Sequence, residues 1–129
     1  MLAIDTSLIV RLLVRDHPAQ SAKANALIDS TDVFVSSTVI LETAWVLRRA
    51  YGYSNEQLGN ALTAFGGLPR VTLEDPSAVV QAVAWMKAGL DFVDALHLAK
   101  ARACDGFVSF DRKFAAAANA VSEIKVRQP

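Results

Sequence analysis

The sequence predicts an α/β fold, a three-layer α/β/α sandwich in which helices cover both faces of a central, mainly parallel sheet. Short continuous apolar runs, such as Val33-Phe34-Val35, indicate strands that are buried on both faces. Longer segments with helical periodicity separate these runs, and this alternation is typical of parallel strands joined by right-handed crossovers. The chain has 129 residues, 53% hydrophobic and 20% charged, which fits one domain, residues 1–129, around a single core.

The expected helices carry recognisable start signals. Asp5 follows the first apolar run, and Pro18 is well placed near the start of a helix. Ser54 and Gln57 form a capping-box pattern. The predicted helices span residues 6–13, 18–29, 36–51, 54–65, 75–89, 91–101 and 112–118. The predicted strands span residues 2–4, 33–35, 71–73, 107–110 and 121–124.

Composition limits the classes of partner and compartment. Lys plus Arg and Asp plus Glu both number 13, so no overall basic field points to nucleic acid, although a basic rim around an acidic site would cancel in the sum. Cys104 is the only cysteine; it makes no internal disulfide or thiolate cluster, and we expect it as a small hydrophobe on a helix. The first residues lack a signal-peptide pattern, and no apolar run reaches the length of a membrane span. We expect a cytoplasmic protein without a membrane partner.

Four acids occupy comparable junctions between predicted elements. Asp5 and Asp111 each follow a strand, Glu42 lies early in the helix after the strand at 33–35, and Asp94 lies in the first turn of its helix. The carboxyl ends of parallel strands share one edge of a sheet, so these acids can meet there. Two carboxylates about 4 Å apart repel by roughly 4 kcal/mol at an effective dielectric of 20. Such a cluster persists only if protons or a cation neutralise it, and oxygen ligands favour Mg²⁺ or Mn²⁺. Bound Mg²⁺ activates water and polarises phosphoryl oxygens, so the acids predict phosphodiester hydrolysis.

The same residues have simpler structural explanations. Asp91 is best explained as an N-cap, and Asp111 is well placed to cap the helix that follows it. Thr6 and Ser7 either make a turn or also touch metal, water or phosphate. The candidate RNA-contacting residues are Arg11, Arg15 and Arg112. Cationic side chains at helical spacing are also common on any solvent-exposed helix surface.

Four motifs together resemble the PIN domain, and more narrowly the VapC-type toxins of bacterial toxin–antitoxin pairs. They are Asp5-Thr6-Ser7, Glu42, the run from Asp91 to Ala99, and Ser109-Phe110-Asp111-Arg112, in the family's order over essentially the whole chain. The resemblance implies a Mg²⁺-dependent endoribonuclease with Asp5, Glu42 and Asp94 as metal-binding carboxylates and Asp111 as the fourth acid. It also implies a homodimer and an antitoxin that inserts a peptide near the site. Candidate accessory residues are Thr6, Ser7, Asp91 and Ser109.

One position departs from the family pattern, and two other functions remain open. Many relatives carry a further acid where this chain has Lys113, which puts a second firmly held metal in doubt. One alternative is phosphotransfer through an aspartyl-phosphate at Asp5, which requires a nearby lysine. The other is a non-catalytic protein-interaction module of the same fold, in which the acids only cap helices.

Overall fold

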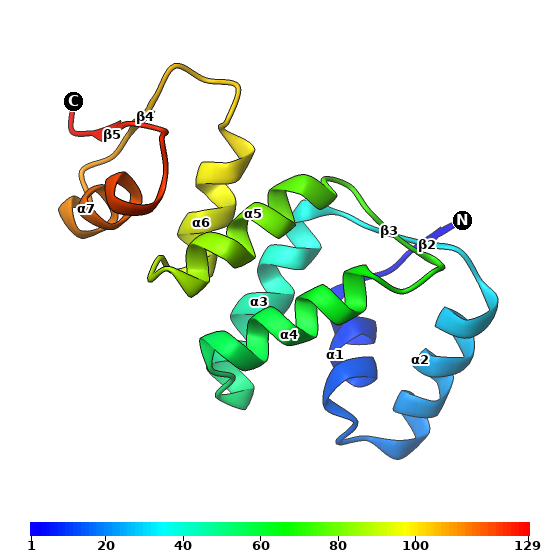
Figure 1. Cartoon of the computed structure of the whole chain (residues 1–129). Helices are drawn as coiled ribbons and strands as arrows, with labels where there is room; N and C mark the ends of the chain where they lie inside the picture. The colour runs from blue at the N-terminus through cyan, green and yellow to red at the C-terminus, as the bar shows by residue number, and fades with distance from the viewer. The chain divides into compact units, whose positions relative to one another are not determined.

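The computed structural model describes all of residues 1–129. The chain forms two compact units, Met1–Pro76 (unit 1) and Ser77–Pro129 (unit 2). Each unit contains parallel strands and helices of its own (Figure 1). The predicted α/β class with parallel strand pairing is confirmed, and the strands form one sheet in each unit.

The sheet of unit 1 has three parallel strands in the order β1-β2-β3. They are β1 (Leu2–Ala3), β2 (Val33–Val35) and β3 (Val71–Leu73). Val33 pairs with both Leu2 and Val71, so β2 is the central strand. Val33 and Val35 have no exposed surface, as expected for a central strand that reads as a continuous apolar run.

The helices of unit 1 begin where their capping residues predict. They are α1 (Thr6–Val14), α2 (Pro18–Ser30), α3 (Ser37–Tyr51) and α4 (Asn55–Gly66). Ser36 caps α3 by accepting from the Val39 N–H, and Ser54 with Gln57 makes the predicted capping box. Helix α1 packs against α2 and α3, and α3 packs against α4 (Figure 1). The largest fully buried side chains of this unit are Ile9, Ile40, Leu47, Leu58, Leu62 and Phe65.

Unit 2 combines three helices with one pair of strands. Its elements are α5 (Pro76–Lys87), α6 (Phe92–Lys100), β4 (Phe107–Val108), α7 (Arg112–Val121) and β5 (Val126–Arg127). Strand β4 pairs in parallel with β5, Phe107 opposite Val126. The Asn119 side chain fixes β5 to α7, because it donates to the Val126 carbonyl at 2.8 Å and accepts from the Val126 N–H at 2.9 Å.

Three local predictions in the C-terminal part are wrong. The strand predicted at 121–124 is the end of α7 and the turn after it, because the alanine-rich segment prolongs the helix to Val121 and the strand begins only at Val126. The strand predicted at 107–110 ends at Val108, where the chain turns toward α7. Cys104 lies exposed in the turn after α6 and not on a helix.

None of the helices combines the length and apolar character that crossing a membrane requires.

Candidate active site

Asp5 lies directly after β1 and is the N-cap of α1. Its Oδ1 accepts hydrogen bonds from the Ser7 hydroxyl at 2.7 Å and from the Leu8 N–H at 3.2 Å. These two bonds hold the pKa of Asp5 below its ordinary value of 3.8, because both stabilise the ionised carboxylate. Both bonds use Oδ1, and neither engages Oδ2.

Glu42 shares a cavity with Asp5. The cavity has a volume of about 390 Å³ and is lined by Asp5, Thr6, Ser7, Val10, Arg11, Glu42, Val46 and Tyr51. Glu42 lies in the second turn of α3, is exposed, and does not cap the helix, because Ser36 does. The structure therefore brings together two of the four predicted acids, with Arg11 as the cation beside them.

Two buried threonines join the helices that carry these acids. Thr6 follows Asp5 and is 7% exposed, while Thr43 follows Glu42 and has no exposed surface. The Thr43 hydroxyl donates to the Thr6 Oγ1 at 3.4 Å, and the Thr6 hydroxyl donates to the Val39 carbonyl at 3.4 Å. The Thr6 hydroxyl is thus committed to α3, whereas Ser7 lies exposed beside Asp5.

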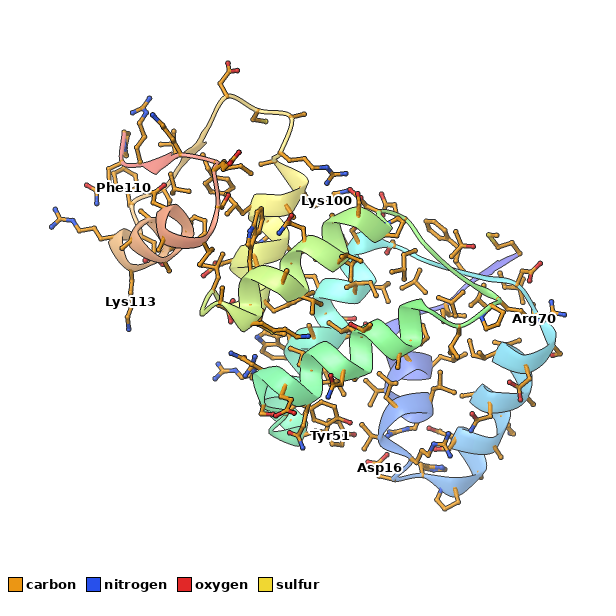
Figure 2. The ribbon with its side chains drawn as sticks, viewed as in Figure 1. Asp16, Tyr51, Arg70, Lys100, Phe110 and Lys113 are labelled. Carbon is orange, nitrogen blue, oxygen red and sulfur yellow. The ribbon has the colours of Figure 1, made fainter.

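Arg11 is held in place by a polar network that the sequence did not reveal. Its guanidinium donates to Asp16 Oδ1 at 2.8 Å and to Gln20 Oε1 at 2.7 Å. The Tyr51 hydroxyl donates to the other oxygen of Asp16 at 3.1 Å, and Figure 2 shows Tyr51, the last residue of α3, near Asp16 in the loop between α1 and α2. No local pattern links Asp16 with Tyr51, because they lie 35 residues apart.

Arg15 lies outside the helix that carries Arg11. It is the C-cap of α1 and has a left-handed backbone with φ 60°. The spacing of four residues between Arg11 and Arg15 therefore does not by itself place both side chains on the same face of α1. Arg15 is exposed.

Unit 2 carries a second group of predicted acids at the start of α6. Asp91 is the N-cap, as predicted, and its Oδ2 accepts from the Asp94 N–H at 3.2 Å. Burial raises the pKa of Asp94 above its ordinary value of 3.8, and the charges of Asp91 and Asp111 raise it further, while His97 opposes them. Asp94 is therefore a half-buried carboxyl whose ionised form is disfavoured until a cation compensates it.

Asp111 belongs to the same group through its effect on Asp94. It is the N-cap of α7, and its Oδ1 accepts from the Phe114 N–H at 2.9 Å. Its own N–H donates to the Ser109 Oγ at 3.0 Å, so Ser109 fixes the turn that presents Asp111. Arg112, the first residue of α7, is exposed.

Helix capping explains some of these acids but not all of them. Asp5, Asp91 and Asp111 are N-caps. Glu42 and Asp94 cap no helix, and each lies beside another of the predicted acids. Neither unit by itself gathers three acidic, histidine or cysteine side chains into a group that could hold a metal ion.

The profile of the PIN domain matches residues 2–120 and so extends through both units. The chain belongs to the PIN-domain family. Among solved structures, this PIN domain is similar to the crystal structure of Mycobacterium tuberculosis VapC20, described as a sarcin–ricin loop cleaving toxin. The two chains are 25% identical, the alignment covers 97% of this chain and 99% of the other, and the TM-score is 0.45. No curated protein matches this chain significantly.

The donor chemistry of the PIN-domain acids fits a hard divalent cation. The candidate ligands are all carboxylates, and Mg²⁺ and Mn²⁺ prefer oxygen ligands. The pKa of Asp5 is lowered, its two side-chain capping bonds use Oδ1, and Glu42 is exposed in the same cavity. Asp94 carries a raised pKa among like charges, and a bound cation relieves that kind of repulsion.

Proposed function

We propose that this PIN domain is a Mg²⁺-dependent endoribonuclease and the toxin of a type II toxin–antitoxin system. Family membership supports the proposal. The observation that carries it is the presence of two acids without a capping role. Glu42 lines the cavity of Asp5, and the pKa of Asp94 is raised by burial and, further, by the charges of Asp91 and Asp111. Acids placed in this way have no evident structural purpose and suit a cation.

The residues have distinct roles in this proposal. Asp5, Glu42, Asp94 and Asp111 would hold the metal. A divalent cation, when bound, polarises a phosphoryl oxygen and lowers the pKa of water. Ser7 and the Leu8 N–H orient Asp5 and keep it ionised. Ser109 orients Asp111 through its backbone N–H. Asp91 caps α6 and so positions Asp94 one turn into the helix.

Binding of RNA would rely on the arginines. Arg112 and Arg15 are exposed and can reach phosphate groups, whereas Arg11 is already bonded to Asp16. In this proposal Arg11 would partly offset the negative charge of the acids in the cavity, in addition to contacting RNA. The proposal also includes a cognate antitoxin protein and a homodimer as partners, in line with the VapC-type resemblance.

A non-catalytic interaction module is the second candidate. The capping roles of Asp5, Asp91 and Asp111 favour it, because these three acids stabilise helices whether or not a metal binds. An aspartyl-phosphate enzyme has less support, because the cation in the cavity of Asp5 is Arg11 and not lysine.

The test is cleavage of a panel of structured and single-stranded RNAs with Mg²⁺ and with EDTA. Wild-type protein should cleave only with the metal, and Asp5→Asn, Glu42→Gln and Asp94→Asn should each abolish cleavage. Asp29→Asn is the matched control, because Asp29 is an exposed acid on α2 away from the cavity. Cleavage that persists in EDTA or in Asp5→Asn would refute the proposal. A folded wild-type protein that cuts no RNA and does not melt higher with Mg²⁺ would favour the interaction module.

A further inference from the structure

Phe110 is the most exposed large hydrophobic side chain of the protein, at 84%. Two other phenylalanines of the same segment are not exposed in this way. Phe107 and Phe114 pack edge to face with ring centroids 5.4 Å apart, and Phe114 is buried. Two rings of the segment therefore pack against each other, and the third lies in solvent. An exposed phenyl ring contributes no hydrophobic stabilisation to the fold.

The backbone holds the exposed ring in a fixed place beside Asp111. The Ser109 N–H donates to the Arg127 carbonyl at 2.9 Å, which ties the residue before Phe110 to β5. The Asp111 N–H donates to the Ser109 Oγ at 3.0 Å, and Asp111 caps α7. Hydrogen bonds on both sides of Phe110 thus fix the turn that presents its ring.

Two cationic residues follow the same turn, directly after Asp111. Arg112 and Lys113 are the first two residues of α7, and both are exposed. Cations at this end of a helix are disfavoured by the helix dipole, so helix stability does not account for them. Phe110 and Lys113 both lie on the outside of unit 2 (Figure 2).

We propose that Phe110 is a substrate-positioning residue on which an unpaired base of the RNA stacks, while Arg112 and Lys113 contact the adjoining phosphates. Proteins commonly bind single-stranded RNA with exposed aromatic rings and cationic side chains. The rings stack on the faces of the bases, and the cations contact the negatively charged phosphates. The inference rests on the proposed nuclease function and adds to it the recognition of an unpaired nucleotide beside Asp111.

The experiment measures binding of a short single-stranded RNA that carries one 2-aminopurine, whose fluorescence changes on stacking. Phe110→Ala should weaken binding about 5- to 150-fold, the range expected for one base–aromatic stack, and should remove the fluorescence change. Phe110→Trp should restore both. The effect on cleavage should lie in KM and not in single-turnover kcat. Val80→Ala is the matched control, because Val80 is 71% exposed on α5 of the same unit.

The outcomes separate this inference from the proposed function. If wild-type protein cleaves RNA and Phe110→Ala binds it as tightly as Val80→Ala does, Phe110 does not stack on RNA and the nuclease proposal stands. A Phe110→Ala protein that changes oligomeric state while its RNA affinity is unchanged would assign the ring to a protein interface and overturn the inference. Failure of the wild type to bind RNA at all would overturn both. Melting curves should show the variants equally folded, because the ring makes little contact with the fold.

Discussion

Asp5 has two roles that substitution can separate. As the N-cap of α1 it accepts from Ser7 and Leu8, and as a proposed metal ligand it supplies negative charge. Asp5→Ala removes both roles, and loss of such a cap costs about 1 kcal/mol, within a range of roughly 0.5–2. In a domain of this size that loss lowers the Tm by about 4 °C. Asp5→Asn keeps a carbonyl oxygen as acceptor, and Asn caps helices about as well as Asp. We expect its Tm to fall by less than half as much.

The pH dependence of stability gives a second readout of the same residue. The pKa of Asp5 is lowered in the folded protein, so the unfolded chain binds more protons in the window below 3.8 and the free energy of unfolding rises with pH there. The stabilising contribution is complete above 3.8 and disappears as the pH falls through the lowered folded pKa. The Tm difference between wild type and Asp5→Asn should therefore shrink in acid.

The assay pairs thermal melting in EDTA with RNA cleavage in Mg²⁺. Asp5→Asn should melt near the wild type and cut no RNA, whereas Asp5→Ala should lose both stability and activity. Asp29→Asn is the matched control, since it makes the same exchange at an exposed acid on α2 outside the cavity. The reasoning is refuted if Asp5→Asn and Asp5→Ala melt at the same reduced temperature, or if Asp5→Asn retains cleavage.

Three further predictions concern other parts of the chain. Burial and the neighbouring charges of Asp91 and Asp111 raise the pKa of Asp94 in the folded protein, so the folded state binds more protons just above pH 3.8 and the free energy of unfolding falls as the pH rises through the folded pKa; Asp94→Asn should therefore raise the Tm at pH 7 in EDTA, and an unchanged or lower Tm would contradict a cost of holding this carboxylate charged. Ser54→Ala removes the capping box of α4 and should cost about 1 kcal/mol by urea denaturation, with cleavage unaffected; a loss of cleavage at unchanged stability would show that the box does more than cap. Asn119→Ala removes two hydrogen bonds to Val126, worth about 1–3 kcal/mol together, and should speed hydrogen exchange in β4 and β5; exchange as slow as in the wild type would mean that strand pairing alone holds β5.

Local signals made most of the fold predictable. The capping box of Ser54 and Gln57 needs only four consecutive residues, and it formed as predicted. Val33-Phe34-Val35 predicted a buried strand because no polar residue interrupts it, and the structure shows it buried at the centre of its sheet. The last strand was misplaced because Val121, which we took as its first residue, is the last residue of α7, and Ser122 caps that helix. Periodicity cannot decide between a helix end and a strand in so short a run.

The parts of the candidate site that were missed depend on contacts between distant residues. Asp16 and Tyr51 are 35 residues apart, and Thr6 and Thr43 are 37 apart. The sequence indicated that Asp5 and Glu42 could approach each other, since neighbouring strands β1 and β2 lead into α1 and α3. The side-chain contacts between α1 and α3 could not be predicted from the sequence. Such contacts depend on the folded geometry and do not produce a pattern of residues at a fixed spacing.

The buried contact between Thr6 and Thr43 has a consequence for metal selectivity. Because each threonine is adjacent to one of the acids, the separation of Asp5 and Glu42 is set by the interior of the protein. Mg²⁺ demands nearly ideal octahedral geometry, whereas larger cations tolerate looser ligand sets. The substitution Thr43→Val keeps the side-chain shape and replaces none of the proposed ligands. It would remove the hydrogen bond to Thr6, so the distance between Asp5 and Glu42 would no longer be fixed by that contact. In the proposed nuclease, a change at this core position would therefore alter the geometry offered to the metal while all four acidic residues are retained.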